Sequence, residues 1–288
     1  MFSSLKKFAS KKVVLTLTAA LLTAGLIAGC GSTGGDNQEK VLKVGAETTF
    51  PPFEFTEGDK YVGFDIDLAD AVAKKMGYKM QFKSMGFDAL IPALQSKDID
   101  MIASGLSATP EREKAVLFSN PYFEKGGFVA IVKKDDTATS MNDLAGKRIV
   151  VQIGSVALDV AEKIPNAQVK SVDSNSQLFN ELKAGTADAI VLDNAVALYY
   201  LKQGADADTK IIGEPVDPEP FVWAFRKDDK QLKEQADKAL ADLKAGAADE
   251  SVNLMPLILA AVKTYATLGE ICNVLREVFG EYEAHSTL

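Results

Sequence analysis

Histidine, cysteine and tryptophan are scarce in this chain of 288 residues, which holds one His, two Cys and one Trp. The single histidine, His285, lies four residues from the end of the sequence. The body of the chain therefore offers no histidine for a Ser-His-Asp triad, a Cys-His dyad or a multi-histidine metal site. This scarcity counts against many enzyme classes.

The chain also lacks an excess of positive charge and a long apolar run. Its formal net charge is −8 and its pI is about 4.9, which argues against a nucleic-acid partner and favours small molecules or proteins. The longest apolar run, Val13 to Ile27, has about 15 residues, below the ~20 that span a bilayer. With 47% hydrophobic and 25% charged residues, the composition is that of one or two globular domains.

The first residues have the pattern of an export signal. Four lysines within residues 1–12 precede the apolar run, and residues 1–29 are predicted to be a signal peptide. The stretch Leu26–Cys30 resembles the lipobox of bacterial lipoproteins, in which the cysteine is acylated and becomes the mature N-terminus. We expect an exported protein, lipid-anchored through Cys30 on the outer face of the cytoplasmic membrane or in the periplasm. Residues 30–39 form a flexible tether, and an acylated Cys30 would leave Cys272 without an intramolecular disulfide partner.

Strand-like and helix-like runs alternate from Val41 onward, which predicts an α/β fold with largely parallel sheets. The predicted strands lie near Leu42–Ala46, Lys79–Lys83, Asp100–Ala103, Arg148–Gln152, Gln168–Val172 and Asp188–Leu192. The predicted helices are Phe64–Met76, Phe87–Lys97, Ser155–Ile164, Ser176–Lys183, Asn194–Leu201 and Lys230–Lys244.

An aromatic-proline segment, Phe50–Phe55, follows the first of these strands. Pro51 and Pro52 remove two backbone donors, so we expect the strand to end before them and Phe50 and Phe53 to lie on a constrained loop outside any ladder. The rings either pack in the core or form the wall of a cleft. We expect Phe50 to be the ligand contact and Phe53 the core residue.

Two apolar runs, 128–136 and 221–229, both end in a basic pair followed by an acidic pair. They are either coincidentally similar strand ends or two crossover strands that join two lobes. Their places at the two ends of the second α/β unit favour the crossover. The predicted first lobe then comprises residues 40–130 and 222–246, and the second lobe residues 131–221.

Three chemically useful groups follow strands and would meet at the carboxyl ends of parallel strands, where open α/β sheets bind ligands. Arg112 lies in the first turn of a predicted helix capped by Thr109, where its guanidinium could bind a carboxylate. The alternative is that Arg112 forms a surface salt bridge. Ser155 opens a helix whose N–H groups suit an anion. Asp193 could hold an ammonium or simply cap the next helix. Anion donors facing a carboxylate suit a zwitterionic α-amino acid.

The chain from Cys30 to about Gly246 resembles the extracytoplasmic polar amino-acid-binding proteins of ATP-binding-cassette importers, which have the two-lobed type II periplasmic-binding-protein fold. The motifs that carry this resemblance are Phe50–Phe55, Gly63–Leu68, Phe87–Leu94, Thr109–Arg112 and Phe118–Tyr122.

The resemblance implies a role for each matching residue. Arg112 would bind the ligand α-carboxylate with backbone N–H groups of Ser107 and Ser155. The α-ammonium would be held by Asp193, the Gly105 carbonyl and the Ser107 hydroxyl. Phe50 and Phe87 would sandwich the ligand side chain, and Glu47 and Gln152 would line the far end of the pocket.

The resemblance further implies a monomeric binding protein without a cofactor, a metal or a catalytic activity. Its ligand would be a polar or basic L-amino acid of the glutamine, arginine, lysine or histidine class, delivered by hinge closure to a membrane permease and its ATPase. Two alternatives stay open: a sensing lipoprotein that does not feed a permease, and a dehydratase-like enzyme in which Glu47 acts as acid or base.

The last part of the chain departs from this family. Residues from about 247 to 288 resemble the C-terminal end of a methylmalonyl-CoA mutase catalytic subunit. They are predicted to form two amphipathic helices. No cobalamin motif or barrel accompanies them. A fusion, a gene-boundary artefact or a chimeric assembly is favoured over a working mutase module.

Overall fold

The computed structural model describes residues 39–124 and 126–248. The predicted signal peptide, Cys30, nearly all of the tether and the tail from residue 249 onward lie outside these ranges. Within them, no helix has both the length and the apolarity to cross a membrane.

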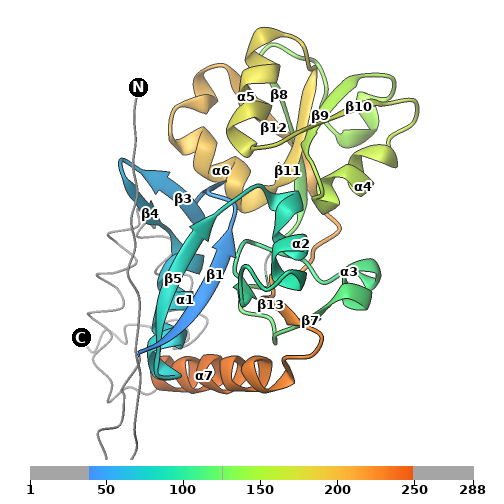
Figure 1. Ribbon diagram of the computed structural model, residues 1–288. Helices are drawn as coiled ribbons and strands as arrows, with labels where there is room; N and C mark the ends of the chain where they lie inside the picture. The colour runs from blue at the N-terminus through green and yellow to red at the C-terminus, as the bar shows by residue number, and fades with distance from the viewer. Residues whose placement is uncertain (1–38, 125, 249–288) are drawn as a thin grey trace, which may run out of the picture. The chain divides into compact units, whose positions relative to one another are not determined.

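The first sheet has five strands: β5 (Tyr78–Ser84), β1 (Lys40–Ala46), β6 (Met101–Ile102), β13 (Ala224–Arg226) and β7 (Val116–Phe118), in that spatial order. β1 runs parallel to both β5 and β6, whereas β13 runs antiparallel to β6 and β7 (Figure 1). β13 follows all the strands of the second sheet in the sequence, so the first sheet is made of two segments that flank the second sheet along the chain.

Helices cover both faces of the first sheet. α1 (Phe64–Lys75) and α7 (Lys230–Ala248) pack on one face, around a core that includes Val44, Trp223 and Phe225. On the other face, the 3₁₀ turn η1 (Phe87–Ala89) leads into α2 (Leu90–Gln95), which buries Leu90 and Leu94. α1 matches the helix predicted over Phe64–Met76, and it carries acidic residues in its first turn and lysines in its last, which suits the helix dipole.

The second sheet also has five strands: β10 (Gln168–Val172), β9 (Arg148–Gln152), β11 (Ala189–Asp193), β8 (Phe128–Lys133) and β12 (Thr209–Val216). β9 is parallel to β10 and β11, and β8 is antiparallel to β11 and β12. α4 (Val156–Glu162) packs on one face of this sheet. α5 (Asn175–Ala184) and α6 (Asn194–Lys202) pack on the other.

The aromatic-proline segment forms a third, small antiparallel sheet of β2 (Thr49–Phe50), β3 (Glu54–Glu57) and β4 (Lys60–Val62). The expectation that Phe50 lies outside any ladder is therefore wrong, because Phe50 pairs with Glu54 across the turn. Phe53 lies in the turn and is 3% exposed, which confirms it as a core residue. Backbone bonds from Phe64 to Pro52 and from Asp65 to Phe53 tie this sheet to the start of α1.

The chain crosses between the two large sheets twice, once between β7 and β8 and once, in residues 217–223, between β12 and β13. The first crossing precedes run 128–136, whereas the second, residues 217–223, includes the first three residues of run 221–229. Among the described residues, β8 pairs within the second sheet and β13 within the first, so neither strand is itself a crossing. The crossings contact each other: Phe221 N–H donates to the Phe123 carbonyl at 2.8 Å, and Tyr122 N–H donates to the Phe221 carbonyl at 3.1 Å. A paired two-strand connection of this kind can act as a hinge.

Candidate functional site

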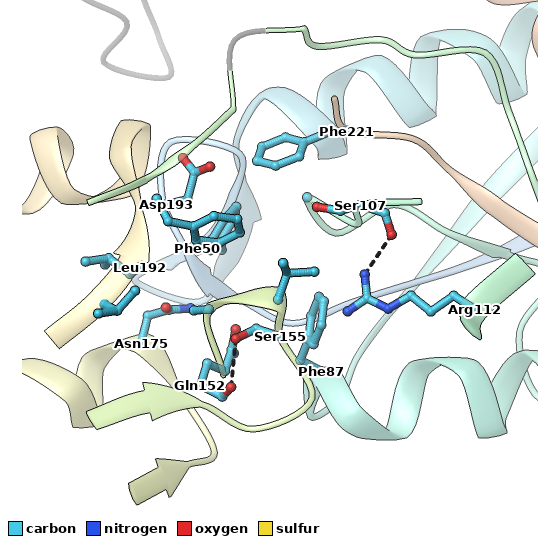
Figure 2. A pocket seen from close by; sticks show the side chains of 15 residues that line it. Phe50, Phe87, Ser107, Arg112, Gln152, Ser155, Asn175, Leu192, Asp193 and Phe221 are labelled. Carbon is cyan, nitrogen blue, oxygen red and sulfur yellow. Dashed lines mark hydrogen bonds between the residues drawn. The ribbon is translucent and has the colours of Figure 1, made fainter. Parts of the chain in front are cut away.

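A pocket lies between the two large sheets, at the ends where β6, β9 and β11 lead into loops and helices (Figure 2). Every residue predicted to bind the ligand lines this pocket except Glu47. The first sheet and its loops contribute Phe50, Phe87, Gly105, Ser107 and Arg112, and the second contributes Gln152, Ser155 and Asp193. The pocket is thus bounded by both lobes.

Arg112 lies in the first turn of α3 (Pro110–Ala115), whose N-cap Thr109 accepts the Arg112 backbone N–H as predicted. Its side chain spans the pocket: Nη1 donates to the Ser107 carbonyl at 2.7 Å and Nη2 to the Gly154 carbonyl at 2.8 Å. It makes no ion pair with either glutamate of α3 within the described residues, so the salt-bridge alternative is not what the structure shows. Burial lowers its pKa, which nearby acidic side chains partly restore.

Asp193 ends β11 and caps α6, which confirms the capping interpretation of this residue. Oδ1 accepts the Ala195 N–H at 2.8 Å, and Oδ2 accepts the Gly127 N–H at 3.4 Å. The residue is 3% exposed, and burial raises its pKa to about 6. A buried carboxylate without a cationic partner in the described structure is suited to receive an ammonium group from a ligand.

Aromatic rings form the apolar walls. The Arg112 guanidinium lies 5.5 Å from the centroid of Phe87, within cation–π range. Phe50 packs against Gly105, where an added Cβ would come within 2.4 Å of the Phe50 ring and where φ is +48°. Glycine is required at position 105 on both counts, and its absence of a side chain lets Phe50 reach the pocket (Figure 2).

Glu47 lies behind this wall and is 5% exposed. Burial raises its pKa, whereas the hydrogen bonds from Thr49 and the nearby side-chain amides of Gln152 and Asn175 act in the opposite direction. Gln152 and Asn175 line the pocket themselves, which places the Glu47 carboxylate next to its lining. The prediction that Glu47 is itself a lining residue does not hold in this conformation.

Ser155 precedes α4, as predicted for the residue that opens this helix. Its hydroxyl donates to the Gln152 carbonyl at 2.8 Å instead of capping the helix (Figure 2). This bond closes the tight turn between β9 and α4, in which Gly154 has a φ of +73°. In this turn Ser155 faces the pocket, and the Gly154 carbonyl is free to accept the hydrogen bond from Arg112.

Several lining residues escaped the sequence analysis: Phe128, Val156, Ala157, Asn175, Val191, Leu192 and Phe221. Asn175 is the most informative of them, since it is 2% exposed and its Nδ2 has no hydrogen-bond partner in the described structure. It begins the helix that follows β10, so the rule that identified Ser155 and Asp193 at strand ends could have identified it too.

Comparison with known proteins agrees with this geometry. The family model described as bacterial extracellular solute-binding proteins, family 3, matches residues 42–251. The arginine-binding extracellular protein ArtP of Bacillus subtilis (strain 168) is 38% identical over 239 residues, 81% of this chain and 92% of the relative. This relative is a binding protein and not an enzyme, in agreement with the expected lack of catalysis.

Two solved structures of an ancestral arginine-binding protein are similar in fold as well as in sequence. Both are 42% identical to this chain, and each alignment covers 84% of this chain and 99% of the other. The structure with bound arginine has a TM-score of 0.70, and the one with bound glutamine has a TM-score of 0.67. The two-lobed periplasmic-binding-protein fold is thereby confirmed.

A second family model, methylmalonyl-CoA mutase, matches residues 223–281. Up to residue 248 this match falls on β13 and α7, which are part of the first lobe. Beyond that point it falls outside the described residues, where the predicted mutase-like tail also lies.

Proposed function

Because the chain belongs to the bacterial extracellular solute-binding proteins of family 3, we propose that it captures a polar or basic L-amino acid and releases it to a membrane permease. Within the glutamine, arginine, lysine and histidine class we favour a basic ligand. The site is formed jointly by two lobes, so the ligand bridges them and stabilises the closed conformation.

One observation carries this proposal: a guanidinium from the first lobe and a buried carboxylate from the second line the same pocket. Arg112 binds the α-carboxylate, helped by N–H groups of Ser107 and Ser155. Asp193 binds the α-ammonium with the Gly105 carbonyl. Charge-assisted hydrogen bonds contribute about 1.5 to 3 kcal/mol each, so bonds at both ends of a zwitterion make micromolar binding, near −8 kcal/mol, attainable.

The preference for a basic side chain rests on the other end of the pocket. Glu47, Gln152 and Asn175 gather there, and no ion pair joins Glu47 to a cation among the described residues. Phe50 and Phe87 stack on the apolar part of the ligand side chain. The names of the relatives support this choice, because ArtP and the ancestral protein are both named as arginine-binding proteins, and the ancestral protein was solved with arginine and with glutamine.

The setting of the protein completes the proposal. The signal peptide exports the chain, and acylation of Cys30 holds a monomeric domain at the outer face of the cytoplasmic membrane or in the periplasm. An ATP-binding-cassette permease and its ATPase receive the amino acid.

Calorimetric titration with L-arginine and two analogues tests the proposal. Agmatine lacks the α-carboxylate and argininic acid lacks the α-ammonium, so we expect each to bind at least thirtyfold more weakly than L-arginine, the loss of roughly one or two charge-assisted bonds. Equal binding of the three would contradict the zwitterion site. Tighter binding of L-glutamine than of L-arginine would contradict the preference for a basic side chain.

A further inference from the structure

Thr49, in β2, holds both carboxylate oxygens of Glu47. Its backbone N–H donates to Oε2 at 3.1 Å, and its hydroxyl donates to Oε1 at 2.8 Å. Two donors from one half-buried residue fix the plane of the carboxylate as well as its position. The orientation of Glu47 therefore depends on Thr49.

The same residue makes two direct hydrogen bonds to the second lobe. The Asn175 backbone N–H donates to the Thr49 hydroxyl at 2.9 Å, and the Tyr200 hydroxyl donates to the Thr49 carbonyl at 3.2 Å. Asn175 begins α5 and Tyr200 lies in α6, whereas β2 is joined through the chain to β1 and α1 of the first lobe. These bonds exist only when the two lobes are together.

The Thr49 hydroxyl thus donates a hydrogen bond to Glu47 and accepts one from the Asn175 backbone N–H. In such a chain a stronger negative charge on the acceptor polarises the hydroxyl and makes it a better acceptor in turn. Burial and the nearby Glu47 carboxylate raise the pKa of Tyr200, so its hydroxyl keeps the proton that it donates. An ionised Glu47 and a closed interface support each other through one side chain.

We propose that Thr49 is a positioning residue that couples the orientation of the Glu47 carboxylate to closure of the lobes, and that this coupling selects ligands with a cationic side chain. The inference rests on the proposed function, since it requires that the ligand side chain face Glu47. A cationic side chain keeps Glu47 ionised and correctly held. A neutral side chain leaves a buried charge unpaired, which costs affinity.

Arg112 provides a point of comparison, because its bond to the Gly154 carbonyl also joins the lobes. That bond lies beside the groups proposed to hold the ligand backbone, which every amino acid shares. The Thr49 bonds lie beside the groups proposed to hold the side chain. Only the Thr49 end of the pocket can therefore discriminate among amino acids.

Thr49→Val removes the hydroxyl at nearly constant volume and keeps the backbone groups, and Thr49→Ser keeps the hydroxyl. Dissociation constants for L-arginine and for its neutral isostere L-citrulline are measured by calorimetry on each variant. We expect Thr49→Val to weaken L-arginine at least tenfold and L-citrulline no more than threefold, and Thr49→Ser to return L-arginine to within threefold of wild type. Tyr200→Phe, which removes only the bond to the Thr49 carbonyl, should weaken both ligands equally.

Equal weakening of the two ligands by Thr49→Val would overturn the inference, because the residue would then act on closure alone. A Glu47→Gln background gives a second test: there Thr49→Val should change L-arginine binding less than twofold, and a tenfold change would again overturn the inference. Wild-type protein that binds neither ligand would overturn the proposed function and the inference with it. Wild-type charge selectivity that survives Thr49→Val would overturn the inference alone.

Discussion

Each of the two lobes has its own five-stranded sheet covered by helices on both faces, but the lobes differ in how many carboxylates they bury and where. Among the described residues, the first lobe buries Glu47, Glu54 and Asp65, and the second buries only Asp193. Burial raises the pKa of all four, and Asp65 and Asp193 both reach about 6. The first lobe accumulates buried acid behind its binding surface, whereas the second places its one buried acid in the pocket.

This difference shows why neither lobe completes the site by itself. The first lobe supplies the guanidinium and the rings of Phe50 and Phe87, and the second supplies the Asp193 carboxylate and the small polar groups of Ser155 and Asn175. A zwitterion satisfies both charges only when it touches both lobes. Ligand binding and closure are then two aspects of one equilibrium.

Loss of the charge from the first lobe should have the largest effect. Arg112→Ala removes the group proposed to hold the α-carboxylate, and the loss of two charge-assisted bonds of about 1.5 to 3 kcal/mol each predicts binding at least a hundredfold weaker in calorimetry. The thermal midpoint should barely move, since among the described residues the Arg112 side chain hydrogen-bonds to two carbonyls at the pocket and contacts the Phe87 ring, without an ion pair.

The matched control is Arg148→Ala, which removes an arginine of the second lobe that pairs with Asp188 outside the pocket. We expect its ligand affinity to equal that of wild type. Unchanged affinity in Arg112→Ala would contradict the assignment of the carboxylate site.

Loss of the Asp193 charge from the second lobe by protonation should reduce ligand affinity less than loss of Arg112, and it should make the affinity depend on pH. Without ligand the pKa of Asp193 is about 6, and an ammonium partner favours the ionised form. Below pH 6 binding must therefore expel a proton, and affinity should fall about tenfold per pH unit. We expect L-arginine to bind roughly tenfold more weakly at pH 5 than at pH 8, with Glu47 adding to the effect in the same direction.

Asp193→Asn separates the two roles of this residue. Asparagine caps a helix as well as aspartate does, so α6 and the thermal midpoint should be preserved. Binding at pH 8 should weaken by roughly ten- to a hundredfold, from the loss of one charge-assisted bond, and its dependence on pH should flatten. A pH dependence as steep as that of wild type would show that another group accounts for it.

Much of the site could be predicted from the sequence because parallel strands end at a common edge. The strand ends at Gln152 and Asp193 and the Thr109-Pro110 helix start were visible as local patterns, and the sheet brings them together. The boundaries of β9 and β10 match the predicted ones for the same reason, since both strands are bounded by clear turn residues.

The features that the sequence did not predict have only weak local patterns in the sequence. β2 is two residues long, too short for a period-two pattern, so Phe50 was placed outside a ladder. The second crossing was placed too late because its apolar residues Phe221, Val222 and Trp223 run directly into β13. Phe221 reaches the pocket through the packing of the two lobes, which no window of sequence contains.

The smallest expected effect concerns stability. Burial, then the neighbouring Asp65 carboxylate, raise the pKa of Glu54 well above its ordinary value. A group with a raised folded-state pKa contributes its stability fully below the unfolded pKa and loses it as pH rises through the folded pKa. Glu54→Gln keeps an oxygen for the Ser104 hydroxyl, which donates to Glu54 at 2.8 Å, and removes the titration.

We therefore expect the thermal midpoint of Glu54→Gln to exceed that of wild type by about 3 °C or more at pH 8, since 1 kcal/mol shifts it by roughly 2 to 4 °C in a domain of this size. At pH 5 the two midpoints should differ less. Asp188→Asn in the second lobe should act with the opposite sign, because its hydrogen bonds with Arg148 lower the pKa of Asp188 and stabilise the fold most at high pH. A midpoint of Glu54→Gln below that of wild type at pH 8 would mean that the first lobe needs the Glu54 carboxylate ionised, and the contrast between the lobes would fail.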